Sequence, residues 1–284
     1  MQVIFQIIAA YFEDDCADEL TNEPVLTEIL RKEVLASQPT LPRFWNRMDE
    51  DTLKQFDIID QAMRNTVYSV RYPDFILFDL DFTLLNTYGN QEGEAFNYHY
   101  QAHGYHSLLC FDGLTGDLLK AELRDGRQYC SKESGEFMTP LMKEFREKYP
   151  SLGLYLRGDS GFASPELYEA CEEYDCKYAI RFKENKKLRE LATSEDEALT
   201  RATKDNVVDC AVEYGEFMYR ASTWTHSRRV VFMIEKPYGQ FVHMYTFVVT
   251  TMEMSPDEVI QFYCARGKMK TLSKKQKADL TFLP

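Results

Sequence analysis

The clearest hydrophobic pattern in the chain is a run over residues 75–80, where five of six residues are apolar. Such a run, preceded by Pro73, is typical of a strand buried on both faces of a sheet. Asp79 and Asp81 lie two positions apart, and therefore on one face of that strand near its C-terminal end. Because ionised groups in a dry core need partners, and chemistry gathers at this end of open α/β sheets, the pair predicts a functional site. The alternative is a solvent-facing strand end followed by a loop.

The first 70 residues show helical spacing without strand-like alternation. Pro39 and Pro42 interrupt this region and separate one helix from the next. Apolar residues then recur at helical spacing over 53–63, after acids that favour a helix start. We therefore predict an all-α region, which either packs against the later sheet or reads DNA with a helix pair.

After residue 80, strands and helices alternate. The segments 108–111 and 118–123 flank a turn and predict an antiparallel meander with the first strand. A helix follows up to Pro150, and the apolar run 152–156 then predicts a second buried strand that ends near Asp159. A β-rich stretch over residues 206–250 and a last helix over residues 255–269 complete the pattern.

Charge changes this picture only locally. The net charge of -13 over 284 residues argues against a generic nucleic-acid binder, because phosphates select for Lys and Arg. Basic residues are nevertheless concentrated in 181–189 and 266–277, so any DNA contact has to use those patches. We predict that Lys186, Lys187 and Arg189 face DNA; a solvated surface is the alternative.

Other candidate chemistry is weaker. The seven cysteines are scattered singly, which favours reduced thiols in a cytoplasmic protein over structural zinc. No apolar run has the length of a membrane span. His99, His103 and His106 sit at helical spacing, but their aromatic neighbours indicate a polar-aromatic surface more than a metal site.

The order of these elements is that of a ribonuclease-H-like fold. One aspartate lies on the first strand, a meander and a helix follow, and the second aspartate ends a parallel strand. Carboxylates from two strands and one late helix would converge on two divalent ions about 3.5–4 Å apart, suited to phosphoryl transfer. All-oxygen ligands of this kind favour Mg²⁺ or Mn²⁺.

Five motifs give the chain a resemblance to a known family. They are Asp79-Leu-Asp-Phe-Thr83, Tyr88-Gly-Asn-Gln-Glu-Gly93, Leu123-Arg-Asp-Gly126, Arg157-Gly-Asp-Ser-Gly-Phe162 and Tyr263-x2-Arg266-Gly267. In this order the chain resembles the DDE transposases of bacterial insertion sequences, over nearly its whole length. The resemblance implies cut-and-paste DNA transposition, with insertion-sequence ends as the DNA partner. A second copy or an intact transposase is the implied protein partner, and no membrane is involved.

The resemblance also assigns residues and regions. Asp81 and Asp159 would be catalytic and would bind metal, with Asp79 as a further candidate ligand. Tyr263, Arg266 and Lys277 match the family's DNA-contacting helix. The implied fold is an α/β ribonuclease-H-like mixed sheet flanked by helices. Its parts would be an N-terminal helical region (residues 1–70), a catalytic core (71–205), a β-rich insertion (206–252), and a final helix with an altered tail (253–284).

The chain departs from the family where the third acid is expected. The signature Tyr-x2-Arg-x3-Glu places glutamate at the position of Lys270. Family members would read roughly Met-Glu-Asn-Phe-Ile-Lys-Glu here, which ATG GAA AAC TTT ATC AAA GAA would encode. Deleting one G after the ATG gives ATG AAA ACT TTA TCA AAG AA, which encodes Met-Lys-Thr-Leu-Ser-Lys and then lysine or asparagine. The second reading matches Met269 through Lys275, so we infer a frameshifted, truncated copy with impaired catalysis.

Two rival interpretations stay open. The motif Asp79-x-Asp81-x-Thr83 is similar to the nucleophile loop of haloacid-dehalogenase-type phosphatases, and Gly158-Asp159-Ser is similar to their Mg²⁺ loop. That family would place a helix or cap after its first strand and an acid about four residues beyond Asp159. The other interpretation is a non-catalytic remnant that binds DNA ends or intact transposase.

Overall fold

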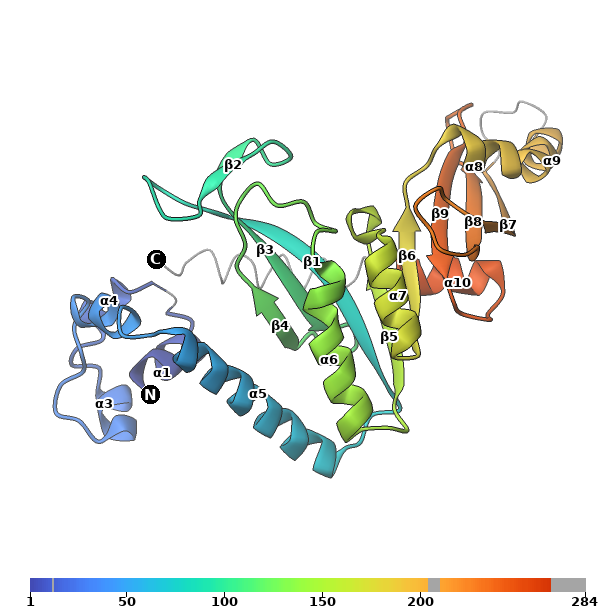
Figure 1. Cartoon of the computed structure of the whole chain (residues 1–284). Helices are drawn as coiled ribbons and strands as arrows, with labels where there is room; N and C mark the ends of the chain where they lie inside the picture. The colour runs from blue at the N-terminus through green and yellow to red at the C-terminus, as the bar shows by residue number, and fades with distance from the viewer. Residues whose placement is uncertain (12, 204–209, 267–284) are drawn as a thin grey trace. The chain divides into compact units, whose positions relative to one another are not determined.

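The computed structural model describes residues 1–11, 13–203 and 210–266, which form two compact units, residues 1–72 and 73–266 (Figure 1). Across these residues no helix combines the length and apolar character needed to cross a bilayer.

Unit 1 is helical, as the spacing of its apolar residues predicts. A small core of Leu20, Leu26 and Leu35 holds its first half together. Asp49 caps the longest helix by accepting from Thr52 N at 2.9 Å. The described helices are α1 (Gln2–Ile8), α2 (Cys16–Glu19), α3 (Pro24–Leu30), α4 (Thr40–Trp45) and α5 (Glu50–Val70).

Unit 2 is built on one mixed sheet. Its strands run in the order β2-β3-β1-β5-β6-β9-β8-β7, and β4 also pairs with β3. β1 is antiparallel to β3 and parallel to β5, and β5 is parallel to β6. This arrangement confirms the predicted ribonuclease-H-like α/β fold. The strands are β1 (Phe75–Asn86), β2 (Ala95–Asn97), β3 (Ala102–Asp112), β4 (Leu118–Glu122), β5 (Gly153–Gly158), β6 (Cys176–Phe182), β7 (Ala211–Tyr219), β8 (Arg228–Lys236) and β9 (Met244–Thr250).

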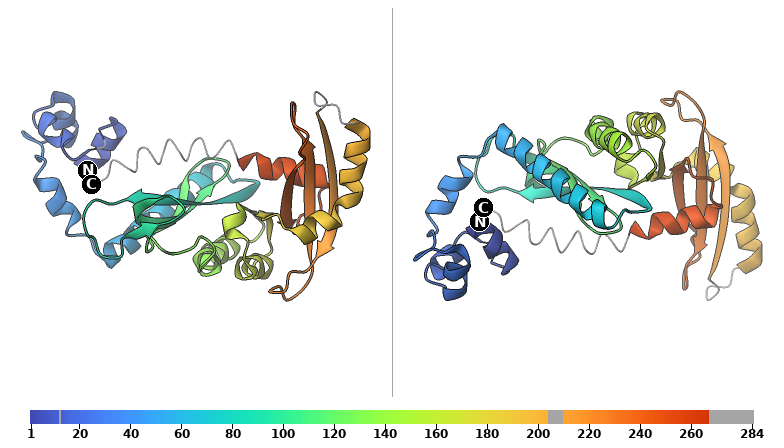
Figure 2. Two further views of the ribbon diagram at one scale, coloured as in Figure 1. Left: turned by 90° about the horizontal axis from the view of Figure 1, so that it is seen from above. Right: turned by 90° about the horizontal axis from the view of Figure 1, so that it is seen from below.

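Helices cover both faces of this sheet. α6 and α7 lie on one face, and α10 lies on the other (Figure 2). Phe78 on β1 and Phe145 on α6 are fully buried and lie edge to face, with ring centroids 5.3 Å apart. The helices of unit 2 are α6 (Ser134–Lys148), the 3-10 turn η1 (Ser160–Phe162), α7 (Pro165–Glu173), α8 (Lys186–Leu191), α9 (Thr193–Thr203) and α10 (Pro256–Cys264).

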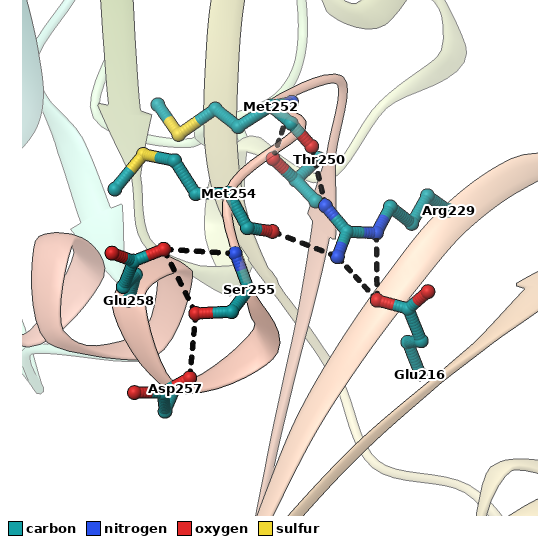
Figure 3. Close-up of polar contacts among 8 residues, drawn as sticks. All are labelled: Glu216, Arg229, Thr250, Met252, Met254, Ser255, Asp257 and Glu258. Carbon is teal, nitrogen blue, oxygen red and sulfur yellow. Dashed lines mark hydrogen bonds and ion pairs between the residues drawn. The ribbon is translucent and has the colours of Figure 1, made fainter.

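The N-terminus of α10 is fastened to the strands before it (Figure 3). Ser255 N and Oγ donate to the Glu258 carboxylate at 3.0 and 2.8 Å, and the two residues form a capping box. The Arg229 guanidinium, on β8, donates to the carbonyls of Met252 and Met254 at 2.5 and 2.9 Å. It also pairs with Glu216 on β7. The chain therefore enters α10 in a fixed direction.

Two local expectations from the sequence were incomplete. His99, His103 and His106 do not share a helix, because β2 and β3 form a hairpin there with Gln101 in a left-handed conformation (φ 54°). The pairing of β3 with β2 and β1 outweighs the helical spacing of the three histidines. The basic segment after β6 leads into α8, and the acidic helix α9 follows; the sequence pattern left both helices unassigned.

Candidate functional site

The two predicted catalytic aspartates come from neighbouring parallel strands. Asp81 lies on β1, and Asp159 follows the last residue of β5. Asp159 caps η1, because its Oδ1 accepts from Gly161 N at 2.8 Å. Parallel pairing of β1 with β5 carries both side chains to the same end of the sheet.

One guanidinium lies between these two carboxylates. Arg266 Nη2 is 3.5 Å from Asp81 Oδ1, and Arg266 Nη1 is 3.7 Å from Asp159 Oδ2. The same guanidinium donates to the Leu80 carbonyl, and Arg266 is only 4% exposed. The structure thus brings together three residues that the sequence singled out, one of them as a DNA contact.

Asp79 has a different partner. Arg157 Nε donates to Asp79 Oδ1 at 2.7 Å, and Arg157 Nη2 donates to Asp79 Oδ2 at 2.6 Å. Both residues are 3% exposed. Because a protein cation engages both Asp79 oxygens, the expectation that Asp79 binds metal has no structural support.

The donor set at Asp81 and Asp159 suits a divalent metal in part. The two residues offer the carboxylate oxygens that Mg²⁺ and Mn²⁺ prefer, and a cationic group already lies between them. Among the described residues no group of three or more His, Cys, Asp or Glu side chains could hold a metal. Lys270 and Lys277 lie outside those residues. The pair therefore fits a hard cation in its chemistry and is short of a third acid.

Two neutral side chains adjoin the pair. Burial raises the pKa of Tyr100 to about 12, and the nearby Asp81, Cys130 and Asp159 add to the rise. Burial likewise raises the pKa of Cys130 to about 12, with Asp159 as the next cause. A Cβ at Gly161 would lie 3.1 Å from Cys130 Sγ, so glycine permits this close approach. No local pattern marks Cys130 as a site residue, and Tyr100 is marked only as one of the aromatic neighbours of the three histidines.

Comparison with known protein families identifies the family of the chain. The model described as "Transposase DDE domain group 1" matches residues 1–283. The chain belongs to this transposase family. No significantly similar sequence was found among curated proteins.

Solved structures that align with this chain include two transposases and an integrase. The piggyBac transposase synaptic complex with hairpin DNA has 12% identity and a TM-score of 0.49, over 96% of this chain and 58% of that chain. The Mos1 transposase paired-end complex has 12% identity and a TM-score of 0.25, over 68% and 65%. The catalytic core domain of BIV integrase has 13% identity and a TM-score of 0.23, over 45% and 70%. The transposase-family chain thus spans 58% of the length of the piggyBac protein.

Three of the residues expected to face DNA in the transposase-family chain, Lys186, Lys187 and Arg189, lie on α8. Lys187 Nζ is 5.6 Å from the Tyr219 ring, and the Arg189 guanidinium is 4.9 Å from the Tyr245 ring. Lys186 is 3.8 Å from Glu190, with a side chain that is 92% exposed. In this α8 cluster (Lys186, Lys187 and Arg189), Lys187 thus contacts β7 and Arg189 contacts β9.

Tyr263 shares α10 with Phe262 and packs partly buried against the hydrophobic cluster around Val259 and Ile260. Burial raises the pKa of Tyr263, although the nearby Arg266 and Arg181 act in the opposite direction. Its phenol therefore stays protonated at neutral pH. Tyr263 and Arg266 are the two described members of the predicted DNA-contacting motif.

Proposed function

We propose that this chain derives from an enzyme that cleaves and joins DNA strands, with Asp81 and Asp159 as its reacting centre. The observation that supports this most strongly is the convergence of both carboxylates on one cation, from adjacent parallel strands. Carboxylates in such a position are suited to in-line phosphoryl transfer. Membership of the transposase family makes DNA the substrate class.

Asp81 and Asp159 are the residues that would hold a divalent metal, Mg²⁺ or Mn²⁺. Members of this family generally use divalent ions. A bound ion would neutralise charge on the transferring phosphoryl group and increase the nucleophilicity of the attacking oxygen. The chain's own contribution is to fix the two carboxylates on β1 and β5 and to surround them with the uncharged Tyr100 and Cys130.

The chain as written is proposed to lack strand cleavage. Lys270 stands at the position of the third acid, and the residues from Met269 to Lys275 match a one-base deletion. A lysine there would remove an oxygen ligand and add a positive charge that repels a metal ion. The activity that stays is DNA binding, either to the element's ends or together with an intact transposase.

DNA binding is proposed to use local positive charge, because the net charge of the chain is -13. The residues proposed to contact phosphates are the α8 cluster and the matched positions Tyr263, Arg266 and Lys277. A second copy of this chain, or an intact transposase, is the proposed protein partner.

The phosphatase alternative is less well supported. An antiparallel hairpin follows β1, where that family would place a helix or cap. Asp79, the residue that would act as nucleophile there, has both oxygens engaged by Arg157. A nucleophile held in this way would first have to leave a buried ion pair.

The test compares three proteins on a supercoiled plasmid that carries the DNA flanking this gene. They are the chain as written, a version with the other reading frame restored after Met269, and the restored version with Asp159→Ala. With Mn²⁺ we expect nicking by the restored version alone. Asp159-dependent nicking by the unmodified chain would contradict the proposed loss of activity. Absence of nicking by the restored version would contradict the proposed reacting centre.

A further inference from the structure

Arg157 joins three elements that lie far apart in the sequence. Its guanidinium forms a two-bonded pair with Asp79 on β1, 78 residues away. The remaining terminal nitrogen, Nη1, donates to the Phe262 carbonyl on α10 at 2.9 Å, 105 residues away. Arg157 itself is on β5. One buried side chain therefore ties β1, β5 and α10 together.

The contact with α10 is made at a position where a helix needs a donor. Phe262 is one of the last four residues of α10, whose carbonyls have no partner within the helix. A cation at this end also interacts favourably with the helix dipole. The Phe262 ring adds to the contact, because it lies 5.2 Å from the Arg157 guanidinium and 6.1 Å from the Tyr155 ring. Arg157 thus fixes the C-terminal half of α10, as Arg229 fixes its start (Figure 3).

Arg266 follows Phe262 by four residues, about one helical turn. It is the residue whose guanidinium lies between Asp81 and Asp159. Because these contacts are long, at 3.5 and 3.7 Å, their geometry depends on where α10 ends. A small shift of the helix would move the guanidinium away from one carboxylate or both.

We propose that Arg157 is a positioning residue that, with Asp79 as its counter-ion, places Arg266 between Asp81 and Asp159. Arg266 then serves as an internal counter-ion that a divalent cation has to displace. This second part rests on the proposed function, because it assumes that the aspartate pair binds such a cation. The first part concerns only the docking of α10.

The test uses one substitution and a matched control in the full chain. Arg157→Lys keeps the positive charge beside Asp79 but removes the planar fork that reaches three acceptors. Arg228→Lys is the control, because Arg228 also forms a buried two-bonded pair, at 2.7 and 2.9 Å from Glu172 on α7. The neutral pair Asp79→Asn/Arg157→Gln replaces Arg157→Lys if that variant does not fold.

The first measurement is amide hydrogen exchange without metal. We expect Arg157→Lys to speed exchange over residues 259–264, relative to the parent and to Arg228→Lys. Equal protection of these amides in both variants would overturn the positioning role. This measurement does not depend on metal binding or on activity.

The second measurement is Mn²⁺ affinity, obtained by titration with detection of free Mn²⁺ by electron paramagnetic resonance. Arg266→Gln should tighten Mn²⁺ binding by at least roughly tenfold in the parent and in Arg228→Lys, because it removes a competing cation. In the Arg157→Lys background the same change should have less than about a threefold effect, because the two residues act together. A full effect of Arg266→Gln in that background would show that Arg157 is only structural.

A third variant separates the two proposals. Asp159→Asn should abolish Mn²⁺ binding if the pair is the cation site. Mn²⁺ binding that survives Asp159→Asn, or no binding by any variant, would contradict the proposed metal site and the displacement of Arg266. The exchange data would still decide whether Arg157 positions α10.

Discussion

Two aspartates on one strand, two residues apart, have different surroundings. Asp79 is enclosed with Arg157 and receives hydrogen bonds of 2.6 and 2.7 Å on both oxygens. Asp81 faces Arg266 at 3.5 Å, and its side chain keeps 13% of its surface exposed. The same residue type on the same face of β1 therefore forms a tight pair at one position and a loose one at the next.

The difference indicates which carboxylate is available for chemistry. A buried two-bonded pair is broken only at a large desolvation cost to the partner left behind. A long contact at the edge of the core can exchange one cation for another at a lower cost. We therefore expect Asp79 to act in stability and in the docking of α10, and Asp81 to act in cation binding.

The largest expected effect is on stability at Asp79. Asp79→Ala leaves the Arg157 charge buried without its counter-ion, and should lower the free energy of unfolding by about 3–5 kcal/mol. Asp81→Ala should cost less, because its contact with Arg266 is long and Arg266 keeps Asp159 as a second counter-ion at 3.7 Å. Urea unfolding of both variants measures the difference. Similar losses in the two variants would remove the contrast between the two positions.

The next effect concerns metal-dependent stability of the parent chain. Mn²⁺ at about one hundred times its dissociation constant should raise the free energy of unfolding by about 2.7 kcal/mol. Asp81→Asn should remove this gain. Asp175→Asn is the control, because Asp175 is an exposed carboxylate paired with Lys177 at 3.1 Å. Loss of the Mn²⁺ effect in the control as well would indicate nonspecific ion binding.

A smaller effect is expected for DNA binding away from the carboxylates. Replacing Lys186, Lys187 and Arg189 with Ala should weaken binding and reduce the salt slope by about 1 for each phosphate that the variant no longer neutralises. Lys143→Ala on α6 is the control, with a side chain that is 60% exposed. Fluorescence anisotropy at several salt concentrations measures both slopes. An unchanged slope in the triple variant would mean that the α8 cluster is only a solvated surface.

The smallest expected effect is a pH dependence of the free energy of unfolding, caused by His106. This residue lies on β3, opposite Leu84 of β1. Burial lowers the pKa of His106, and its Nδ1 contacts the Gln128 carbonyl at 2.7 Å. Below about pH 6.5 the unfolded chain binds a proton that the folded chain excludes, so stability falls as pH decreases through this window. His106→Asn keeps a donor for the carbonyl and should remove this slope. Unfolding curves between pH 5 and about pH 7.5 would show it.

Much of the fold follows from local sequence patterns. The apolar runs that end near Asp81 and Asp159 predict β1 and β5, because burial on both faces selects such runs. Ser255 and Glu258 predict the start of α10, because a capping box satisfies helix amides locally. The aspartates were found as candidates because each lies at the end of a buried run. The helical spacing of the three histidines does not correspond to a helix, since strand pairing is set by distant residues.

The sequence by itself determined most of the order of strands and helices, though not α8 and α9, as well as the two aspartates at strand ends and the departure from the family at Lys270. Hydrophobic periodicity, capping residues and motif spacing are properties of short segments, so they can be read without the fold. Only the tertiary structure decided which cation each carboxylate meets. The register of β1 on β5 pairs Asp79 with Arg157, and the docking of α10 carries Arg266 to Asp81 and Asp159. These contacts join residues 78 to 185 positions apart, and no local pattern specifies them.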